Sequence, residues 1–195
     1  MLSVTKPILL ASNSPRRKQL LQEAGFPFEV EVIPTEETYP DDLPTDEIAG
    51  YISHQTAEMF KAAAYHSKLV LTADTVVILE DRVLGKPADK ADAARMLTLL
   101  SGNTHKVITA VSLLTDDVIT TVSDTSLVSF RKMEETEINY YIEQYKPFDK
   151  AGSYGIQEWI GMTGIEKIEG SFYSIMGLPV HVVYQLLKPY INGFS

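Results

Sequence analysis

The sequence has 195 residues, 45% of them hydrophobic, which is enough to bury a full core as one domain. It contains no cysteine, so disulfides, thiolate nucleophiles and cysteine-bound zinc or iron–sulfur clusters are excluded. The formal net charge of −9 disfavours general binding to nucleic acid or anionic lipid. We therefore expect a single cytoplasmic domain over residues 1–195 that binds neither nucleic acid nor membrane.

The first half of the chain alternates between strand and helix patterns. The apolar run at residues 8–11 predicts a first strand and is too short for a signal sequence or a membrane span. Ser14, Pro15 and Gly25 are typical of the cap, first turn and end of a helix. Alternation predicts a strand at 28–33, which a long acidic loop follows. A helical pattern covers about 45–65, and a run that is apolar on both faces except at Asp74 and Thr75 predicts a central strand at 69–79.

The second half continues this mixed pattern. A helix is expected at 88–100, and strands at 107–114 and 118–130 are joined by a hairpin turn at Asp116 and Asp117. Helices are expected at 134–145 and 180–190. A mixed α/β unit follows from this order.

The turn from Ser12 to Arg17 is the first candidate site. It joins a strand to a helix N-terminus and carries two hydroxyls and the guanidiniums of Arg16 and Arg17, a combination suited to phosphate. An ordinary capped helix with solvated arginines has the same pattern, so this segment alone leaves both interpretations open.

Asp74 is the second candidate, because it interrupts an otherwise apolar strand where an unpaired carboxylate would be costly. Lys86 stands between a flexible glycine and a rigid proline, although alone it is more typical of a surface lysine. Acidic residues of the long loop could bind a hard cation such as magnesium: Glu36, Glu37, Asp41 and Asp42.

Other familiar sites are missing from the sequence. It has neither a Walker A motif nor GxGxxG, so ATPase and dinucleotide-binding interpretations lose their usual support. No metal-ligand spacing or nucleophile elbow involves the histidines, to which we assign no catalysis: His54, His66, His105 and His181.

Several motifs together resemble the Maf family in that family's order and spacing, over about residues 8–187. They are Leu10–Arg17, Ala73–Val77, Gly85–Pro87, Ser101–His105 and Asp149–Gln157, with Gly177–Pro179 further on. The resemblance implies a fold like that of inosine triphosphate pyrophosphatases, an elongated mixed sheet flanked by helices with a cleft between two lobes. It also implies hydrolysis of a nucleoside triphosphate to the monophosphate and pyrophosphate with a divalent cation, Mg²⁺ or Mn²⁺, and suggests a homodimer.

The resemblance also implies a substrate and a set of site residues. Arg16, Thr75 and Gln157 match the branch of the family that is specific for dTTP and UTP. Asp74 and Lys86 would be catalytic, and Glu37 and Asp74 would hold the metal. The substrate would be bound by Ser12, Arg16, Arg17, Lys61, Thr75 and Gln157, of which Lys61 lies in a weaker motif match.

A mechanism follows from these roles. A water activated at Asp74 and the metal would attack the α-phosphorus, with pyrophosphate leaving. Modified pyrimidine triphosphates are an alternative substrate. A protein of another class, a nucleotide-binding regulator of septum formation without significant turnover, is the alternative function.

Overall fold

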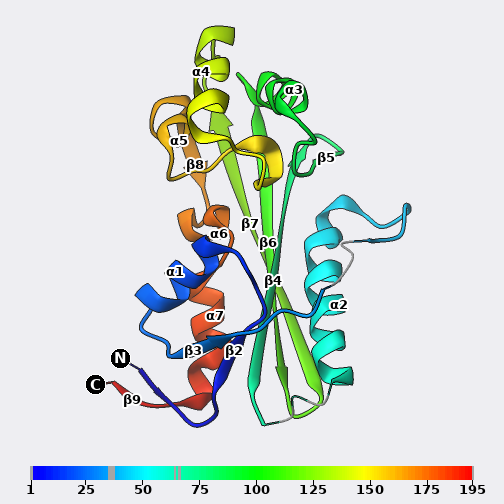
Figure 1. The fold of residues 1–195 in the computed structure, drawn as a ribbon, viewed down its shortest axis with the longest axis vertical. Coiled ribbons are helices and arrows are strands. Elements are labelled where there is room, and N and C mark those ends of the chain that lie inside the picture. Colours follow the sequence, from blue (N-terminus) through cyan, green and yellow to red (C-terminus); the bar gives the residue numbers. More distant parts are fainter. Residues whose placement is uncertain (1, 35–37, 64, 66, 195) are drawn as a thin grey trace. The chain divides into compact units, whose positions relative to one another are not determined.

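The computed structural model describes residues 2–34, 38–63, 65 and 67–194, which form a mixed α/β structure (Figure 1). The strands are β1 (Leu2–Val4), β2 (Ile8–Leu10), β3 (Phe28–Val30), β4 (Leu69–Leu79), β5 (Arg82–Leu84), β6 (Thr104–Thr115), β7 (Val118–Phe130), β8 (Ile165–Glu169) and β9 (Ile191–Phe194). The α-helices are α1 (Pro15–Glu23), α2 (Ile48–Ala62), α3 (Lys90–Leu100), α4 (Glu135–Tyr145), α5 (Trp159–Gly164), α6 (Phe172–Met176) and α7 (Val180–Leu187). Short 3₁₀ turns occur at Thr45–Glu47, Ala151–Ser153 and Lys188–Tyr190.

Within the described residues, seven strands form one mixed sheet in the order β3-β2-β4-β6-β7-β8, with β5 paired to β4. β2 runs parallel to both β3 and β4, whereas β4 with β5 and β7 with β8 are antiparallel. β1 and β9 pair separately, with Leu2 opposite Phe194. The prediction of a mixed α/β fold, with helices around a multistranded sheet, is confirmed.

The chain divides into two compact units. Unit 1 comprises Met1–Asp74, Thr109–Asp124 and Gly177–Ser195, and unit 2 comprises Thr75–Ile108 and Thr125–Met176. The strands β4, β6 and β7 each contribute residues to both units. The chain first passes from unit 1 to unit 2 between Asp74 and Thr75, two of the predicted site residues.

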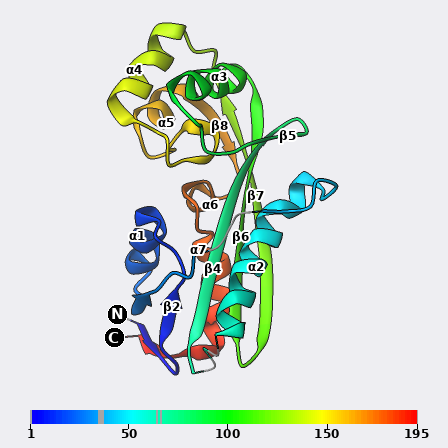
Figure 2. The same cartoon turned by 45° about the vertical axis from the view of Figure 1, so that its right-hand side comes forward.

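In unit 1, α2 covers one face of the strands and α1 and α7 cover the other (Figures 1 and 2). Phe60 of α2 is fully buried against Leu9 of β2 and Val70 of β4. On the other side, the ring of Phe26, just after α1, lies 6.4 Å from the ring of Tyr184 in α7. Because β2 and the first part of β4 are buried on both faces, they are apolar without alternation, as expected of central parallel strands.

In unit 2, α3, α4 and α5 bury apolar side chains beside the far parts of the long strands (Figure 2). Leu97 and Leu100 of α3 and Ile142 of α4 are almost completely inaccessible to solvent. The segment between α4 and α5 carries the Asp149–Gln157 motif and includes the 3₁₀ turn at Ala151–Ser153. This unit therefore has a core of its own.

The predicted helices and strands are all present and differ from the predictions only at their ends, whereas β1, β8, β9, α5 and α6 were not predicted from the sequence. The predicted hairpin turn is confirmed, since Asp116 and Asp117 both adopt positive φ between β6 and β7. The strand predicted at 28–33 ends at Val30, because its partner β2 ends opposite it at Leu10. The helix predicted at 180–190 ends at Leu187 and continues as a 3₁₀ turn, because Pro189 cannot donate an α-helical hydrogen bond.

The described helices are short. The longest in the list above is α2 with 15 residues, and in the part of the chain that the structure describes no helix combines the length and apolar character needed to cross a bilayer.

Candidate functional site

The strand-to-helix turn after β2 is built as the sequence predicts. Pro15 occupies the start of α1, and the Ser14 hydroxyl accepts a hydrogen bond from the Arg17 amide at 3.4 Å. Ser12 is only 6% exposed, and its hydroxyl accepts a hydrogen bond from the Ser14 amide at 3.2 Å. The turn is thus held by its own hydroxyls at a helix N-terminus, the end that attracts anions.

Arg17 ties this turn to the start of the C-terminal helix. Its Nε donates to the carbonyl of Gly177 at 2.9 Å, and its Nη1 donates to the Ser12 hydroxyl at 3.3 Å. Gly177 has φ of +109°, a conformation that favours glycine. Part of the Arg17 guanidinium therefore fixes the geometry of unit 1, a role that the sequence pattern did not reveal.

Asp74 and Thr75 lie in the middle of β4, where the burial pattern changes from fully buried to partly exposed. Side chains alternate between the two faces of a strand, so Asp74 shares a face with Thr72, whose hydroxyl donates to the Ser53 carbonyl of α2 at 2.7 Å. Thr75 shares the opposite face with Val77. Asp74 is thus partly exposed where it interrupts the apolar strand, and it lies in the middle of β4 rather than at a strand end.

The predicted lysines lie on different units. Lys61, in the last turn of α2, is 36% exposed and its ammonium is 3.8 Å from the Glu58 carboxylate. Lys86 is exposed in the segment after β5. The carbonyl of Gly85, the residue before Lys86, accepts a hydrogen bond from the Gly152 amide at 3.1 Å. The Asp149–Gln157 motif therefore contacts the Gly85–Pro87 motif within unit 2.

Gln157 is exposed in a turn just before α5. Its neighbours are not exposed, because Gly155 and Ile156 are buried and Glu158 is partly buried. The structure thus presents one amide side chain from a buried backbone, which suits a residue that contacts a ligand. Gln157, Thr75 and Lys86 all belong to unit 2.

The sequence prediction missed a polar network behind this turn. The Tyr141 hydroxyl of α4 donates to the Glu158 carboxylate and accepts a hydrogen bond from the Gly155 amide at 3.0 Å. The Lys150 ammonium lies 2.8 Å from Asp149 and 3.2 Å from Glu158, and its side chain is only 10% exposed. Lys150 lies inside a motif quoted for the family resemblance, but Tyr141 carries no sequence signal beyond a helical pattern.

His105 is buried beside the same motif. Its Nε2 lies 2.7 Å from the Tyr154 hydroxyl, and its ring stacks on Phe130 with ring centroids 5.5 Å apart. Burial lowers the pKa of His105 to about 4 and raises the pKa of Tyr154 above its usual range. His105 and Tyr154 are therefore both neutral near pH 7.

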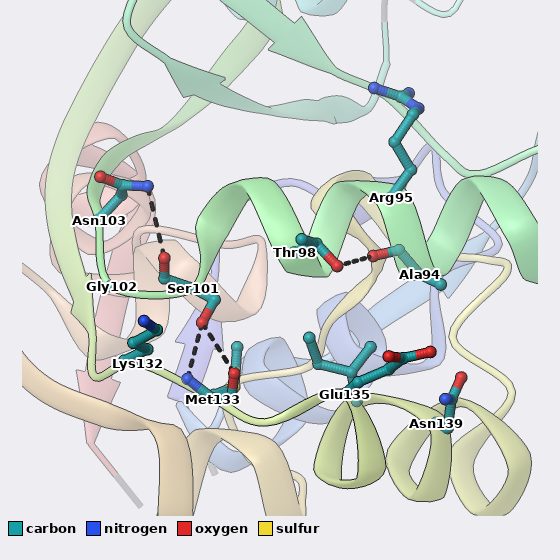
Figure 3. Close-up of a pocket in the computed structure, with 11 residues that line it drawn as sticks. Ala94, Arg95, Thr98, Ser101, Gly102, Asn103, Lys132, Met133, Glu135 and Asn139 are labelled. Atoms are coloured by element: carbon teal, nitrogen blue, oxygen red, sulfur yellow. Dashed lines mark hydrogen bonds between the residues drawn. The ribbon is translucent and has the colours of Figure 1, made fainter.

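A separate pocket of about 540 Å³ lies in unit 2 between α3, α4 and the Ser101–Asn103 turn (Figure 3). In Figure 3 the Ser101 side chain points toward Met133, with which it exchanges hydrogen bonds: the Met133 amide donates to the hydroxyl at 2.7 Å. The predicted site residues do not line this pocket, and the Ser101–His105 motif holds α3 to the segment after β7.

Parts of the predicted metal site lie outside the described residues. These include Glu37, together with the other loop candidate Glu36, and His66 lies outside them as well. Among the residues that are described, no group of three or more histidines and carboxylates could hold a metal ion.

The fold is that of a mixed α/β protein whose capped turn places two hydroxyls and two arginines at a helix N-terminus. Residues 7–190 match the model of the family described as Maf-like protein, and the chain belongs to the Maf family. A relative from Parabacteroides distasonis is 50% identical over 93% of this chain and 94% of its own length, and one from Porphyromonas gingivalis is 47% identical over 94% of both. Both relatives are named dTTP/UTP pyrophosphatase.

Solved structures also overlap this fold in part. The Ham1 protein of Staphylococcus aureus aligns with 64% of this chain and 72% of its own, at 18% identity and a TM-score of 0.42. A dITP/XTP pyrophosphatase from Mycobacterium abscessus aligns with 65% of this chain and 75% of its own, at 18% identity and a TM-score of 0.38. The family assignment depends on the sequence matches.

Proposed function

We propose that this chain hydrolyses dTTP and UTP to the nucleoside monophosphate and pyrophosphate. The observation that carries the proposal is the 50% identity, over 93% of the chain, to a relative named dTTP/UTP pyrophosphatase. The cap geometry of the Ser12–Arg17 turn supports it, because a helix N-terminus beside arginines suits a triphosphate.

Asp74 is proposed as the general base. Its carboxylate accepts a proton from the water whose oxygen attacks the α-phosphorus. The bond from that phosphorus to the bridging oxygen breaks, and pyrophosphate leaves with its electron pair. Partial exposure in the middle of β4 supports this role, because a carboxylate must be reached by water to act on it.

The cations are proposed to stabilise charge on the phosphate oxygens. Arg16 lies in the first turn of α1 and Lys86 between Gly85 and Pro87, and both would act electrostatically, as would Lys61. Arg17 would both bind phosphate and hold Ser12, given its hydrogen bond to that hydroxyl. Loss of one such cation is expected to lower the rate on the order of a hundredfold.

The donor set fits a divalent cation such as Mg²⁺ or Mn²⁺. Mg²⁺ is commonly held by one or two carboxylates, waters and substrate phosphates, so Asp74 with Glu37 would suffice without a larger cluster. When bound, the cation would lower the pKa of water and offset phosphate charge. Glu37 remains a prediction from the sequence.

Gln157 is proposed to contact the base. Its amide offers one acceptor and two donors, which match the N3 donor and O4 acceptor of uracil or thymine. Thr75 is proposed as a further substrate contact. A single domain over residues 1–195, a homodimer and a cytoplasmic location remain predictions from the sequence, as does activity on modified pyrimidine triphosphates.

The experiment that tests the proposal is a pyrophosphate-release assay over the common NTPs and dNTPs with Mg²⁺ or Mn²⁺. We expect turnover of dTTP and UTP well above that of purine triphosphates, since a site built on polar contacts rejects the wrong base strongly. Preference for purines would overturn the substrate assignment. Tight nucleotide binding without pyrophosphate release would instead support the regulatory alternative.

The same assay tests the role of Asp74. The change Asp74→Asn removes the base while keeping the side-chain size, so turnover of dTTP should fall at least about a hundredfold with an unchanged circular dichroism spectrum. Asp81→Asn, in the exposed turn after β4, is the matched control and should retain turnover. Wild-type turnover in Asp74→Asn would refute the assignment.

A further inference from the structure

The turn that presents Gln157 is held by Tyr141 of α4 and by Lys150 of the segment between α4 and α5. Gln157 itself is exposed, whereas the Glu158 side chain is only 18% exposed and is directed to Tyr141 and Lys150. Glu158 stands at the N-cap position of α5 but makes no cap hydrogen bond with its side chain. Its carboxylate is therefore used for tertiary contacts rather than for the local helix end.

Tyr141 joins Glu158 and Gly155 through its single hydroxyl group. Its side chain is fully buried, and burial beside the Glu158 carboxylate raises the pKa of Tyr141 well above its usual range. The hydroxyl thus keeps its proton and donates a hydrogen bond to the Glu158 carboxylate, while its oxygen accepts a hydrogen bond from the Gly155 amide at 3.0 Å. One hydroxyl therefore holds both ends of the segment that contains Gln157.

Lys150 supplies the balancing charge. The Glu158 carboxylate is largely buried, and an unpaired charge in that position would be costly. The Lys150 ammonium lies 3.2 Å from it and is paired on the other side with the more exposed Asp149. Lys150 therefore pairs with the Glu158 carboxylate at the place where Tyr141 donates to it.

Close packing leaves the turn little room to move. A Cβ on Gly155 would lie 2.7 Å from the Glu158 carboxyl carbon, so the turn closes directly on that carboxylate. The Glu158 amide donates back to the Gly155 carbonyl at 3.0 Å. The backbone on both sides of Gln157 is thus determined by the position of Glu158.

We propose that Tyr141, Glu158 and Lys150 are positioning residues that set the orientation of Gln157 and thereby the preference for pyrimidine triphosphates. The inference rests on the proposed function, in which Gln157 contacts the base. The three residues do not touch substrate in this scheme. They hold the Gln157 amide with its donor and acceptor toward the pyrimidine edge before substrate binds. Binding then loses less conformational entropy, because the side chain is already ordered.

This role differs from general stabilisation in what it predicts. Loosening the turn should weaken only the contact with the base, so kcat/KM for dTTP and UTP should fall while the low kcat/KM for a purine triphosphate stays the same. A merely structural role would lower both by the same factor. The ratio of the two values is therefore the decisive quantity.

The test uses the full chain with Tyr141→Phe, which removes only the hydroxyl, and Glu158→Gln, which keeps the size but not the charge. Kinetics with dTTP, UTP and GTP should show the pyrimidine-to-purine ratio reduced by about tenfold in Tyr141→Phe, mainly through KM. Glu158→Gln keeps an acceptor for Tyr141 and should show a smaller loss. Matched controls are Tyr140→Phe, on the exposed side of α4, and Glu143→Gln, which breaks the surface pair with Lys90.

An independent readout does not depend on activity. The Gly155 amide donates to Tyr141 and should be protected from hydrogen exchange in the wild type, and this protection should be lost in Tyr141→Phe but kept in Tyr140→Phe. Lost protection with an unchanged substrate ratio would overturn the positioning role, as would an equal loss for all three triphosphates. A wild type that shows no pyrimidine preference would instead contradict the proposed function, while the exchange result would still report on the network.

Discussion

At the scale of single residues, His105 shows how burial changes a histidine from a candidate for chemistry into a structural group. It is 2% exposed, and in the described residues its Nδ1 lacks a hydrogen-bond partner. Protonation would place a charge in this apolar setting, so the pKa of the folded state lies at about 4, below the ordinary value of 6.5. The folded protein therefore favours the neutral form of the His105 ring.

This shift predicts a pH dependence of stability. As pH falls from 6.5 toward 4, the unfolded state takes up a proton at His105 before the folded state does, so the histidine's contribution is present above pH 6.5 and lost as pH falls toward 4. The expected loss is about 3 kcal/mol of unfolding free energy. Urea unfolding at several pH values should show a flatter pH dependence of the unfolding free energy in His105→Gln than in the wild type. Equal slopes in the two proteins would contradict the shift.

At the scale of elements, α5 packs directly on the backbone that precedes it. A Cβ on Gly161 would lie 1.9 Å from the carbonyl oxygen of Ile156, a backbone atom that cannot turn away. The helix can therefore approach the turn of Gln157 only because residue 161 is glycine. Packing of this kind links the short helix to the presentation of Gln157.

The corresponding prediction concerns Gly161→Ala. The added methyl group must push α5 away from Ile156, so we expect a destabilisation of about 1–3 kcal/mol or more, together with a lower kcat/KM for dTTP. The change in the urea midpoint and steady-state kinetics would measure both effects. Gly193→Ala is a suitable control, because a Cβ there meets nothing within 4 Å. Wild-type stability in Gly161→Ala would show that α5 is not packed this closely.

At the scale of the whole molecule, the strands β4, β6 and β7 connect the two units. Each strand has residues in both, so loss of structure in either unit removes hydrogen-bond partners from strands that continue into the other. This continuity favours a single cooperative unfolding transition, as expected if residues 1–195 behave as one domain.

Coincident unfolding curves would test this expectation. The single tryptophan, Trp159, lies in unit 2 and reports on that unit, whereas far-UV circular dichroism reports on the helices and strands of both. The two signals should give the same midpoint in urea. Separate midpoints would indicate that the units unfold independently and would contradict the prediction of one domain.

The sequence by itself determined the features that depend on neighbouring residues. The capped turn at Ser14 and Pro15, the apolar central strand and the hairpin at Asp116 and Asp117 follow from local backbone preferences and hydrophobic periodicity. The ordered motifs also predicted the Maf family, which the family model confirmed. Roles for individual site residues, including Glu37 outside the described residues, stay predictions.

Only the tertiary structure decided which distant groups meet. Arg17 donates to the carbonyl of Gly177, 160 residues away, and Tyr141 of α4 donates to Glu158 at the start of α5. The pairing of Leu2 with Phe194 closes short strands near the two ends of the chain that no local pattern predicted. These contacts depend on how helices and strands pack rather than on local propensity, which is why the residues that fix the turn of Gln157 could not be found from the sequence alone.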